Sequence, residues 1–449
     1  MNAAKHLATW PLLLLPLCGR AVAAEADRAT APVSFSRQLA PILQEHCVAC
    51  HSAKNAEGGY RVDTYNALVT PGDSELAAVT ARHPESSELL RRLTTEDESE
   101  RMPAESEPLT AEQIELFTRW IAAGGEPDVE DRDAPLTFVI PPPEYPRPPE
   151  TYPGVALTAV AFSPDGSRVL LGGYHELTLW DADDGRLVER IGNLGQRIYA
   201  IAFDPAGTMM AVACGEPGRS GEVRLVEIAT GKVTAVVGRS DDVVLDVAFR
   251  PGRDQLAIAA ADRSVRVIDR STLEPATSWS GHVDWVTALA WSDDGTRLVT
   301  ASRDRSAAVL EVDSGRLLAT YKGHGAAVRG VAFTAGGKQV LSVGDDGKLH
   351  RWDVSGGKRV ADVALGGPGT GIVRGDGFVL VSSASRRVLR IDLATDRVTQ
   401  TYDGYDDWVL AAALHPGDGR VVAGGFGGQA RLWSADGRLL RHWTAAGSE

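Results

Sequence analysis

The chain has 449 residues, of which 43% are hydrophobic and 24% are charged. This length suits two or three domains, and the composition is that of an ordinary soluble globular protein. The formal net charge of −14 argues against nucleic acid and anionic membrane surfaces as partners, because both carry negative charge themselves.

Residues 1–24 have the pattern of a cleavable secretory signal. Lys5 stands before a short apolar stretch at 12–17, and the small residues of 21–24 follow it. The apolar stretch is too short to cross a bilayer as a helix, so we expect no integral membrane segment after cleavage. A buried N-terminal helix and lipid attachment at Cys18 are the alternatives. The pattern predicts an exported, periplasmic protein whose remaining chain has 44 basic and 60 acidic residues, a net charge of −16.

The first domain is predicted to be small and helical and to cover residues 33–127. Apolar residues over 35–43 fall on one helical face, and Pro41 either kinks this segment or marks a helix start. A clearer helix is predicted over 110–123, with Thr110 as its N-cap and a pair of glycines directly after its end.

Residues 47–51 read Cys-Val-Ala-Cys-His, the most informative pattern in the chain. Two thiols at this spacing can form thioethers with one haem, and the adjacent His51 is then placed as an axial iron ligand. A thioredoxin-like redox pair is the alternative for Cys47 and Cys50, but His51 and the lack of a surrounding βαβ pattern argue against it. Cys214 lies in an apolar run and is predicted to be a buried core thiol.

Met102 is the candidate for the second axial ligand. It is the only methionine of this domain and stands between Arg101 and Pro103 in a polar segment. A soft thioether suits the sixth position of a low-spin haem and raises its potential. A gap-filling core methionine is the structural alternative, and His83 is the rival ligand.

Nine of the 24 prolines lie in residues 127–153. A segment of this composition prefers extended polyproline geometry, so residues 128–153 are predicted to be a stiff linker. Residues 136–140 within it are a candidate strand.

The chain repeats from residue 154 onwards. Each unit contains a strand ending in a large apolar residue, a glycine turn, a second strand, a third strand that often ends in Trp-Asp, and a short fourth strand. Seven units of four short strands predict a β-propeller over 154–449. The unit anchors, spaced 40–46 residues apart, fall at 162, 203, 249, 291, 333, about 373 and 414.

Residues 154–449 resemble the WD-repeat family. In that family a hydrogen-bonded tetrad ties the strands of a blade together and has no catalytic role. The fifth unit has the whole tetrad, and the fourth keeps three members with Leu310 in place of tryptophan. The matching residues are His324, Ser342, Asp346 and Trp352 in the fifth unit and His282, Thr300 and Asp304 in the fourth.

Residues 33–127 resemble the planctomycete-type c-type cytochrome domain. The resemblance implies one covalent haem c and export, although Ala104 stands where the family usually has a second proline. The whole chain is thus expected to be multidomain: a small all-α cytochrome c-like domain followed by an all-β seven-bladed WD-repeat propeller. The resemblance is carried by Pro41–Leu43, Cys47–His51, Gly58–Asp63, Pro84, Ser87, Leu89, Arg101–Pro103 and the helix over 109–124.

Together the two parts predict an exported monohaem c-type cytochrome that transfers single electrons. Its propeller is expected to dock other proteins, and its negative charge favours a basic redox partner. An oxidoreductase with a second cofactor in the propeller and a haem-based redox or gas sensor are the alternatives. No catalytic residue is assigned, because the histidines of the repeats show no ligand spacing; they are His175, His282, His324, His350, His415 and His442.

Overall fold

The computed structural model describes residues 32–444 except 54, 105, 142, 151, 153 and 241. The predicted signal at 1–24 therefore lies outside the described residues. The chain divides into two compact units, Met1–Pro143 and Glu144–Glu449. Within the described residues, no helix combines the length and the apolar character needed to cross a membrane.

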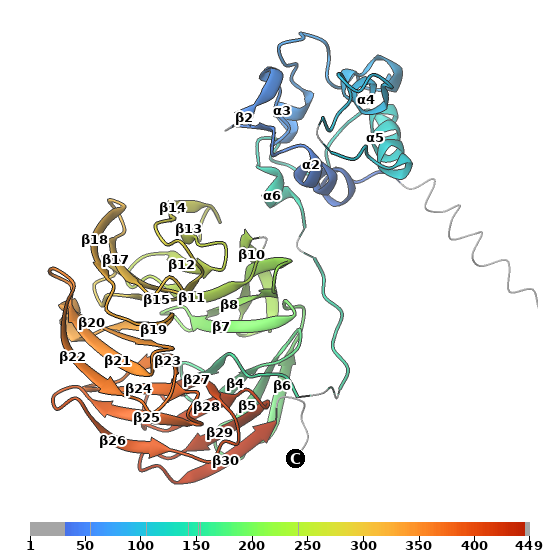
Figure 1. The fold of residues 1–449 in the computed structure, drawn as a ribbon. Helices are drawn as coiled ribbons and strands as arrows, with labels where there is room; N and C mark the ends of the chain where they lie inside the picture. The colour runs from blue at the N-terminus through green and yellow to red at the C-terminus, as the bar shows by residue number, and fades with distance from the viewer. Residues whose placement is uncertain are drawn as a thin grey trace, which may run out of the picture. The chain divides into compact units, whose positions relative to one another are not determined.

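The first unit is small, and its regular elements are mostly short helices, although irregular segments make up more than half of its described residues and it also has a β ladder (Figure 1). A π-helical turn over Phe35–Leu39 leads directly into the first α-helix, and a two-residue β ladder follows the cysteine motif. The α-helices are α2 (Ala40–His46), α3 (Tyr65–Val69), α4 (Glu88–Thr94), α5 (Ala111–Ala123) and α6 (Leu136–Val139), and the ladder joins β1 (His51–Ser52) to β2 (Asn55–Ala56).

Helix α5 begins and ends as its sequence predicts. Thr110 and Gln113 form a reciprocal capping box, and Gly124 follows the helix with a φ of 124° that favours glycine. The apolar face buries Phe117 and Trp120 in the core of the unit, where Trp120 stacks on Phe35. The long helix thus ties the N-terminal turn to the rest of the unit.

The predicted linker over 128–153 is shared between the two units. Its candidate strand at 136–140 is wrong: Leu136–Val139 is a single helical turn. Leu136 is fully buried in the core of the first unit, and its N–H donates to the carbonyl of Asp63 over 2.9 Å. The sequence did not indicate that Leu136 is buried, because the prolines around it are typical of an extended linker. Further on, the hydroxyl of Tyr152 donates to Glu176 of the propeller over 2.9 Å.

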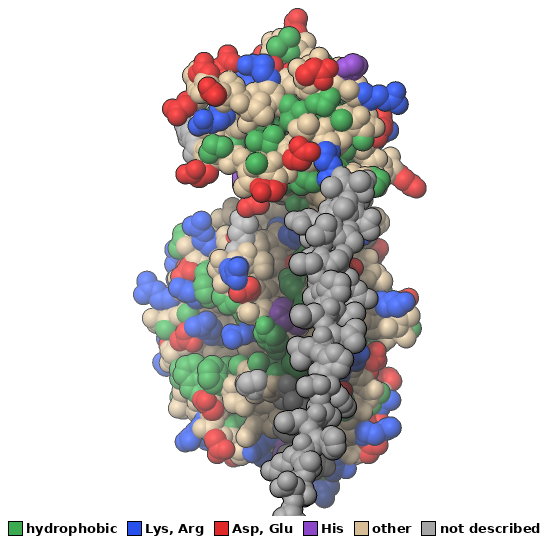
Figure 2. Space-filling view, turned by 90° about the vertical axis from the view of Figure 1, so that its right-hand side faces the viewer, with side chains coloured by type: hydrophobic (Ala, Val, Ile, Leu, Met, Phe, Trp, Pro, Cys, Tyr) green, Lys and Arg blue, Asp and Glu red, His purple; other side chains and the backbone are tan. Residues whose placement is uncertain are grey.

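Charge is distributed unevenly between the two units. Residues 32–143 carry 9 basic and 20 acidic side chains, a net charge of −11. Residues 144–449 carry 34 basic and 38 acidic side chains, a net charge of −4. Figure 2 shows acidic and basic side chains on the visible faces of both units, with Asp and Glu prominent on the first. The acidity of the protein therefore resides mainly in its small unit.

The second unit is a propeller of seven four-stranded antiparallel sheets, as predicted. The first four blades are β3–β6 (Val160–Phe162, Arg168–Gly172, Leu177–Asp181, Leu187–Ile191), β7–β10 (Arg197–Phe203, Met209–Glu216, Ser220–Glu227, Lys232–Ser240), β11–β14 (Val244–Phe249, Gln255–Ala260, Val265–Asp269, Pro275–Trp279) and β15–β18 (Val286–Trp291, Arg297–Ser302, Ala307–Glu311, Arg316–Tyr321). The last three are β19–β22 (Val328–Phe333, Gln339–Gly344, Lys348–Asp353, Lys358–Ala364), β23–β26 (Gly369–Arg374, Phe378–Ser383, Arg387–Asp392, Arg397–Tyr402) and β27–β30 (Val409–Leu414, Val421–Gly425, Gln429–Trp433, Leu439–Thr444).

The first strands of successive blades contact one another and form the inner ring, which closes where β27 meets β3 (Figure 1). The second strands β12, β16, β20 and β24 bury every residue except the first. Neighbouring blades cover both faces of these strands, so their sequences are nearly continuous apolar runs. The degraded sixth unit still forms all four strands.

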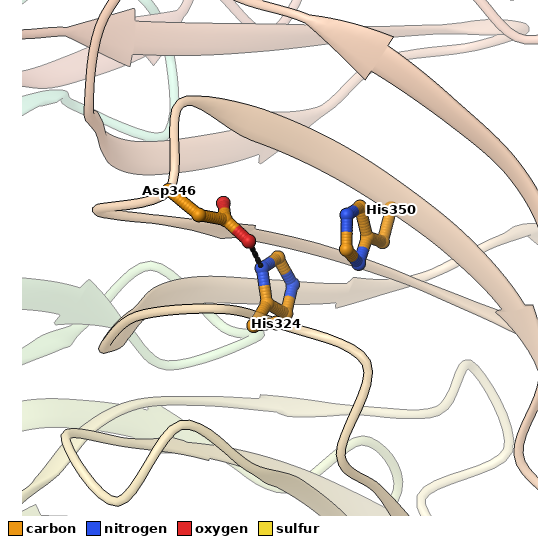
Figure 3. A group of neighbouring side chains, drawn as sticks. All are labelled: His324, Asp346 and His350. Atoms are coloured by element: carbon orange, nitrogen blue, oxygen red, sulfur yellow. Dashed lines mark hydrogen bonds and ion pairs between the residues drawn. The ribbon is translucent and has the colours of Figure 1, made fainter.

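The fifth blade contains the complete tetrad (Figure 3 shows two members). His324 Nδ1 hydrogen-bonds Asp346 over 2.8 Å, and its Nε2 meets the Ser342 hydroxyl over 2.8 Å. The indole N–H of Trp352 donates to the same hydroxyl over 3.2 Å. In the fourth blade His282 contacts Thr300 and Asp304 in the same way, each over 2.9 Å. Both predictions are confirmed, and these histidines hold loops to strands.

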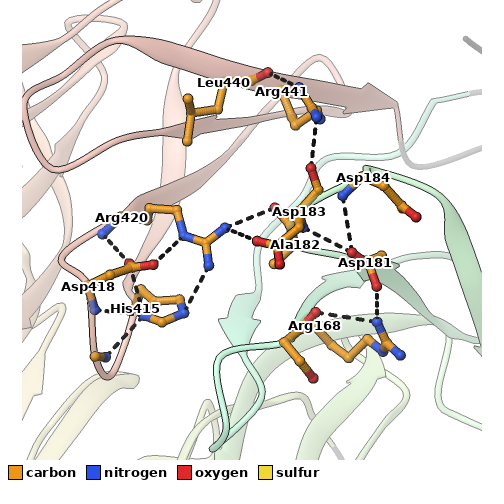
Figure 4. A network of polar contacts seen from close by, with 12 residues as sticks. Arg168, Asp181, Ala182, Asp183, Asp184, His415, Asp418, Arg420, Leu440 and Arg441 are labelled. Carbon is orange, nitrogen blue, oxygen red and sulfur yellow. Dashed lines mark hydrogen bonds and ion pairs between the residues drawn. The ribbon is translucent and has the colours of Figure 1, made fainter.

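The ring closes between the last blade and the first without a shared sheet, since each blade uses four consecutive strands. The N–H of Leu157 donates to the carbonyl of Gly425 over 3.0 Å. Arg420 reaches from the last blade to Asp183 of the first over 2.8 Å (Figure 4). The indole N–H of Trp443 donates to the carbonyl of Gly185 over 2.9 Å. One backbone hydrogen bond and several side-chain contacts therefore join the two ends of the ring.

Candidate haem-binding site

A cavity of about 380 Å³ opens in the first unit, in the size range typical of cofactor sites. Cys47, His51 and Met102 all line it. Most of the remaining wall is apolar and includes Leu89 and Leu93 of helix α4. A haem needs an apolar surface for its macrocycle and nitrogen or sulfur ligands for its iron, so the residues present fit this group.

The cysteine motif follows α2 as a compact turn. The N–H of Cys47 donates to the carbonyl of Leu43 over 2.9 Å, and the N–H of His51 donates back to the carbonyl of Cys47 over 3.0 Å. Cys47 is partly buried at the cavity, whereas Cys50 is exposed, and both carry free thiols. The turn thus brings one thiol and the imidazole to the cavity and leaves the second thiol accessible beside them.

The contacts of His51 select one of its ring nitrogens as a ligand atom. Its Nδ1 lies 3.2 Å from the carbonyl oxygen of Tyr60, which can only accept, so Nδ1 carries the proton. The lone pair is then on Nε2, the nitrogen left for a metal. Tyr60 is itself fixed, because its hydroxyl donates to the carbonyl of Leu68 over 2.7 Å. A carbonyl contact of this kind fixes the tautomer and the ring orientation of a metal-binding histidine.

Burial, and to a smaller extent the neighbouring Cys50, together raise the pKa of the Cys47 thiol to about 12. Redox-active cysteines usually have a lowered pKa, because the thiolate is the reactive form. The environment of Cys47 therefore argues against thioredoxin-like chemistry and suits a cysteine that serves as an attachment point. Cys214 is fully buried in the propeller, as its apolar context predicts.

Of the two candidates for the second iron ligand, the structure places only Met102 at the cavity. Met102 lies at the cavity, and its N–H donates to the carbonyl of Arg92 over 2.8 Å. The side chain of His83 is 62% exposed and pairs with Glu85 over 3.0 Å, and it is not among the residues that line the cavity. The sequence candidates Cys47, His51 and Met102 are brought together, and His83 is not.

Two polar residues at the cavity were missed by the sequence reasoning. Glu88 and Arg92, one helical turn apart on α4, both line the cavity and pair over 2.8 Å. The Arg91 and Arg92 guanidiniums lower the pKa of Glu88 to about 2, against the opposing effect of its burial. The i, i+3 and i, i+4 spacing of these charges was the available signal.

Among the described residues of the propeller, His324, Asp346 and His350 place potential ligand atoms within 4.8 Å of one another (Figure 3). Both nitrogens of His324 are used by the tetrad. The two imidazoles are stacked at 4.0 Å and nearly parallel, with 12° between their planes. An ion in the plane of one ring would lie outside the plane of the other, so this group is structural. The stacking of His350 on His324 was not anticipated.

Comparison with known proteins finds a different family match in each of the two units. Residues 47–106 match the family model described as Planctomycete cytochrome C. Segments 273–309, 315–353 and 396–434 match the model described as WD domain, G-beta repeat.

The chain is also similar to a curated plant protein, the "Transcriptional corepressor LEUNIG_HOMOLOG" of Arabidopsis thaliana. The two are 25% identical over 142 residues, which are 31% of this chain and 17% of that protein. The similarity thus spans less than a fifth of the relative. With the two family matches, the chain combines a planctomycete-type cytochrome c segment with a seven-bladed WD-repeat propeller.

Proposed function

We propose that this protein is an exported monohaem c-type cytochrome that carries single electrons and docks other proteins through its propeller. The observation that carries the proposal is the cavity that Cys47, His51 and Met102 line together. The composition of residues 1–24 supports export to the periplasm, where c-type attachment is expected.

The four candidate residues, Cys47, Cys50, His51 and Met102, have distinct roles in this proposal. Cys47 and Cys50 would anchor the haem covalently. This role accounts for the exposed thiol of Cys50, which lies beside the cavity motif without lining the cavity. Nε2 of His51 and the sulfur of Met102 would hold the haem iron. When bound, haem c supplies a one-electron couple, and the thioether ligand favours its reduced form. The mostly apolar wall of the cavity suits the macrocycle of a haem.

The charge distribution supports a basic redox partner. The first unit has a net charge of −11 over residues 32–143 and would attract such a partner to the unit that holds the cavity. The attraction should accelerate association and weaken as salt screens it. The propeller, with its seven blades and smaller net charge, is proposed as the surface for other proteins.

Optical spectroscopy combined with stopped-flow reduction tests the proposal. An electron carrier should show a low-spin, six-coordinate haem, bind carbon monoxide poorly, and exchange electrons quickly with basic small cytochromes. The exchange should slow as ionic strength rises. Rapid carbon monoxide binding with slow, salt-insensitive exchange would support a sensor instead. A second chromophore would indicate an oxidoreductase.

A further inference from the structure

The described residues of the segment that carries Met102 form no helix or strand. It spans residues 95–110, between the end of α4 and the start of α5. Its sequence contains six acidic residues and one basic residue, Arg101, so its charges repel one another. An axial ligand on such a segment needs contacts with a regular element to hold its place.

Helix α4 supplies these contacts. The N–H of Met102 donates to the carbonyl of Arg92 over 2.8 Å, at the end of a helix where carbonyls lack intrahelical partners. Two residues before Met102, the carboxylate of Glu100 accepts a hydrogen bond from Arg91 over 2.5 Å. Arg92 also donates to the carbonyl of Glu100 over 3.4 Å. The segment is therefore attached to consecutive residues of α4.

A local turn directs Glu100 toward the helix. The N–H groups of Glu100 and Arg101 both donate to the carbonyl of Asp97 over 3.0 Å. The Asp97 carboxylate in turn accepts from the N–H of Ser99 over 2.9 Å. The short turn fixes the backbone of Glu100 and leaves its side chain on the side of Arg91.

Arg91 connects the segment to the cavity wall. Besides Glu100, its guanidinium holds Glu88 with two hydrogen bonds of 2.7 Å each. The side chain of Glu88 is only 12% exposed and lines the cavity. A continuous ion-pair chain thus leads from the cavity wall through Arg91 to the residues next to Met102.

We propose that the network Glu88–Arg91–Glu100 positions Met102 as an iron ligand and keeps external ligands from replacing it. This inference rests on the proposed function. Arg91 offsets part of the repulsion within the acidic segment by pairing with Glu100, two residues before Met102. A thioether is a weak ligand, so its occupancy depends on how firmly the protein holds it in place. These residues act through Met102 and do not contact the reacting group.

The test titrates imidazole into the ferric holoprotein and follows the visible spectrum. Glu100→Gln should raise the apparent imidazole affinity about fivefold, because a partly exposed ion pair contributes up to about a factor of five. Arg91→Gln should raise it at least as much, and the double variant should not exceed Arg91→Gln, since both remove the same pair.

The matched control is Glu126→Gln. Glu126 also pairs with an arginine, Arg132, over 2.5 Å on the same unit, and among the described residues no hydrogen bond or ion pair joins these two side chains to the Met102 segment. The control should retain the wild-type imidazole affinity and the red charge-transfer absorption of a methionine–iron bond. Melting curves of all variants identify any general loss of stability.

The possible failures are distinguishable. If the wild-type holoprotein lacks the methionine–iron absorption, the ligand assignment in the proposed function fails before any variant is compared. If the wild type shows it and Glu100→Gln behaves like Glu126→Gln, Met102 is a ligand but the network does not position it, and the inference is overturned.

Discussion

The two units of this protein are stabilised in different ways. The propeller repeats one four-stranded pattern seven times, and each inner strand contacts the next. Among its described residues the first unit has five α-helices, one π-helical turn and two 3-10 turns around a single core, and most residues that line its cavity lie outside the α-helices. Repetition gives the propeller many equivalent contacts, whereas the ligand set of the first unit depends on a few particular residues. Single substitutions at the cavity should therefore change haem binding strongly, whereas single substitutions in the propeller should each change its stability only slightly.

The largest expected effect follows from the loss of the anchoring thiols. Replacing both Cys47 and Cys50 by alanine should abolish covalent haem attachment, because no other cysteine lies near the cavity among the described residues. Haem should then extract completely into acidified organic solvent, while each single variant retains one thioether. The propeller should keep its own unfolding transition in calorimetry of the full chain. Free extraction of haem from the wild type would eliminate the haem c assignment.

The next effect concerns Met102. Met102→Ala should convert a low-spin haem to high spin or open it to external ligands, and should lower the potential. The absorption spectrum and a redox titration measure both changes. His83→Ala serves as the comparison, because His83 is exposed and paired with Glu85. A change in the His83 variant together with an unaltered Met102 variant would assign the ligand to His83.

A smaller effect is predicted for the propeller at low pH. Burial lowers the pKa of His350 to about 4, and its Nε2 has no hydrogen-bond partner among the described residues. An unfolded imidazole titrates near 6.5, so unfolding takes up a proton between these values. The folded propeller therefore has the full stabilisation from neutral His350 above about pH 6.5 and loses it as the pH falls to about 4.

The loss attributable to His350 should be on the order of 1–2 kcal/mol in the free energy of unfolding. His350→Gln keeps a polar group near Tyr321 but cannot titrate, and His324 remains in both proteins as a common background. Denaturant unfolding at pH 7.5 and pH 4.5 measures the difference. Equal pH dependence in the wild type and the variant would show that His350 does not contribute.

The smallest effect is expected at the seam of the ring. Arg420 is mostly buried and donates to the carbonyl of Ala182 and to Asp183, so Arg420→Met should cost about 0.5–1 kcal/mol. Asp183 is 84% exposed, and Asp183→Asn should cost much less. Chemical denaturation compares the two variants. If Asp183→Asn destabilises the propeller as much as Arg420→Met, the seam depends on the exposed ion pair.

The propeller fold could be predicted because the same pattern of strands and turns recurs every 40–46 residues, so that each repeat supports the interpretation of the others. The capping box at Thr110 and the tetrads were equally accessible, since their residues stand at fixed spacings. Leu136 was misjudged because a single apolar residue among prolines gives no periodic signal, although it is buried in the core.

The candidate ligands of the site could be named from the sequence, but their surroundings could not. The carbonyl of Tyr60 that orients His51 comes from nine residues away and is a backbone group, so no side-chain pattern announces it. The pairing of Arg91 with Glu100 depends on how the intervening segment folds back onto α4. Tertiary contacts of this kind have no signature in one sequence.

Intact-mass spectrometry of the denatured, exported protein tests the central claim most directly. The account predicts that the chain, after loss of an N-terminal segment near residue 24, carries the mass of one haem in addition to its polypeptide. The Cys47→Ala/Cys50→Ala variant should have the polypeptide mass alone. A wild-type protein without added mass, isolated from cells able to mature c-type cytochromes, would contradict the account.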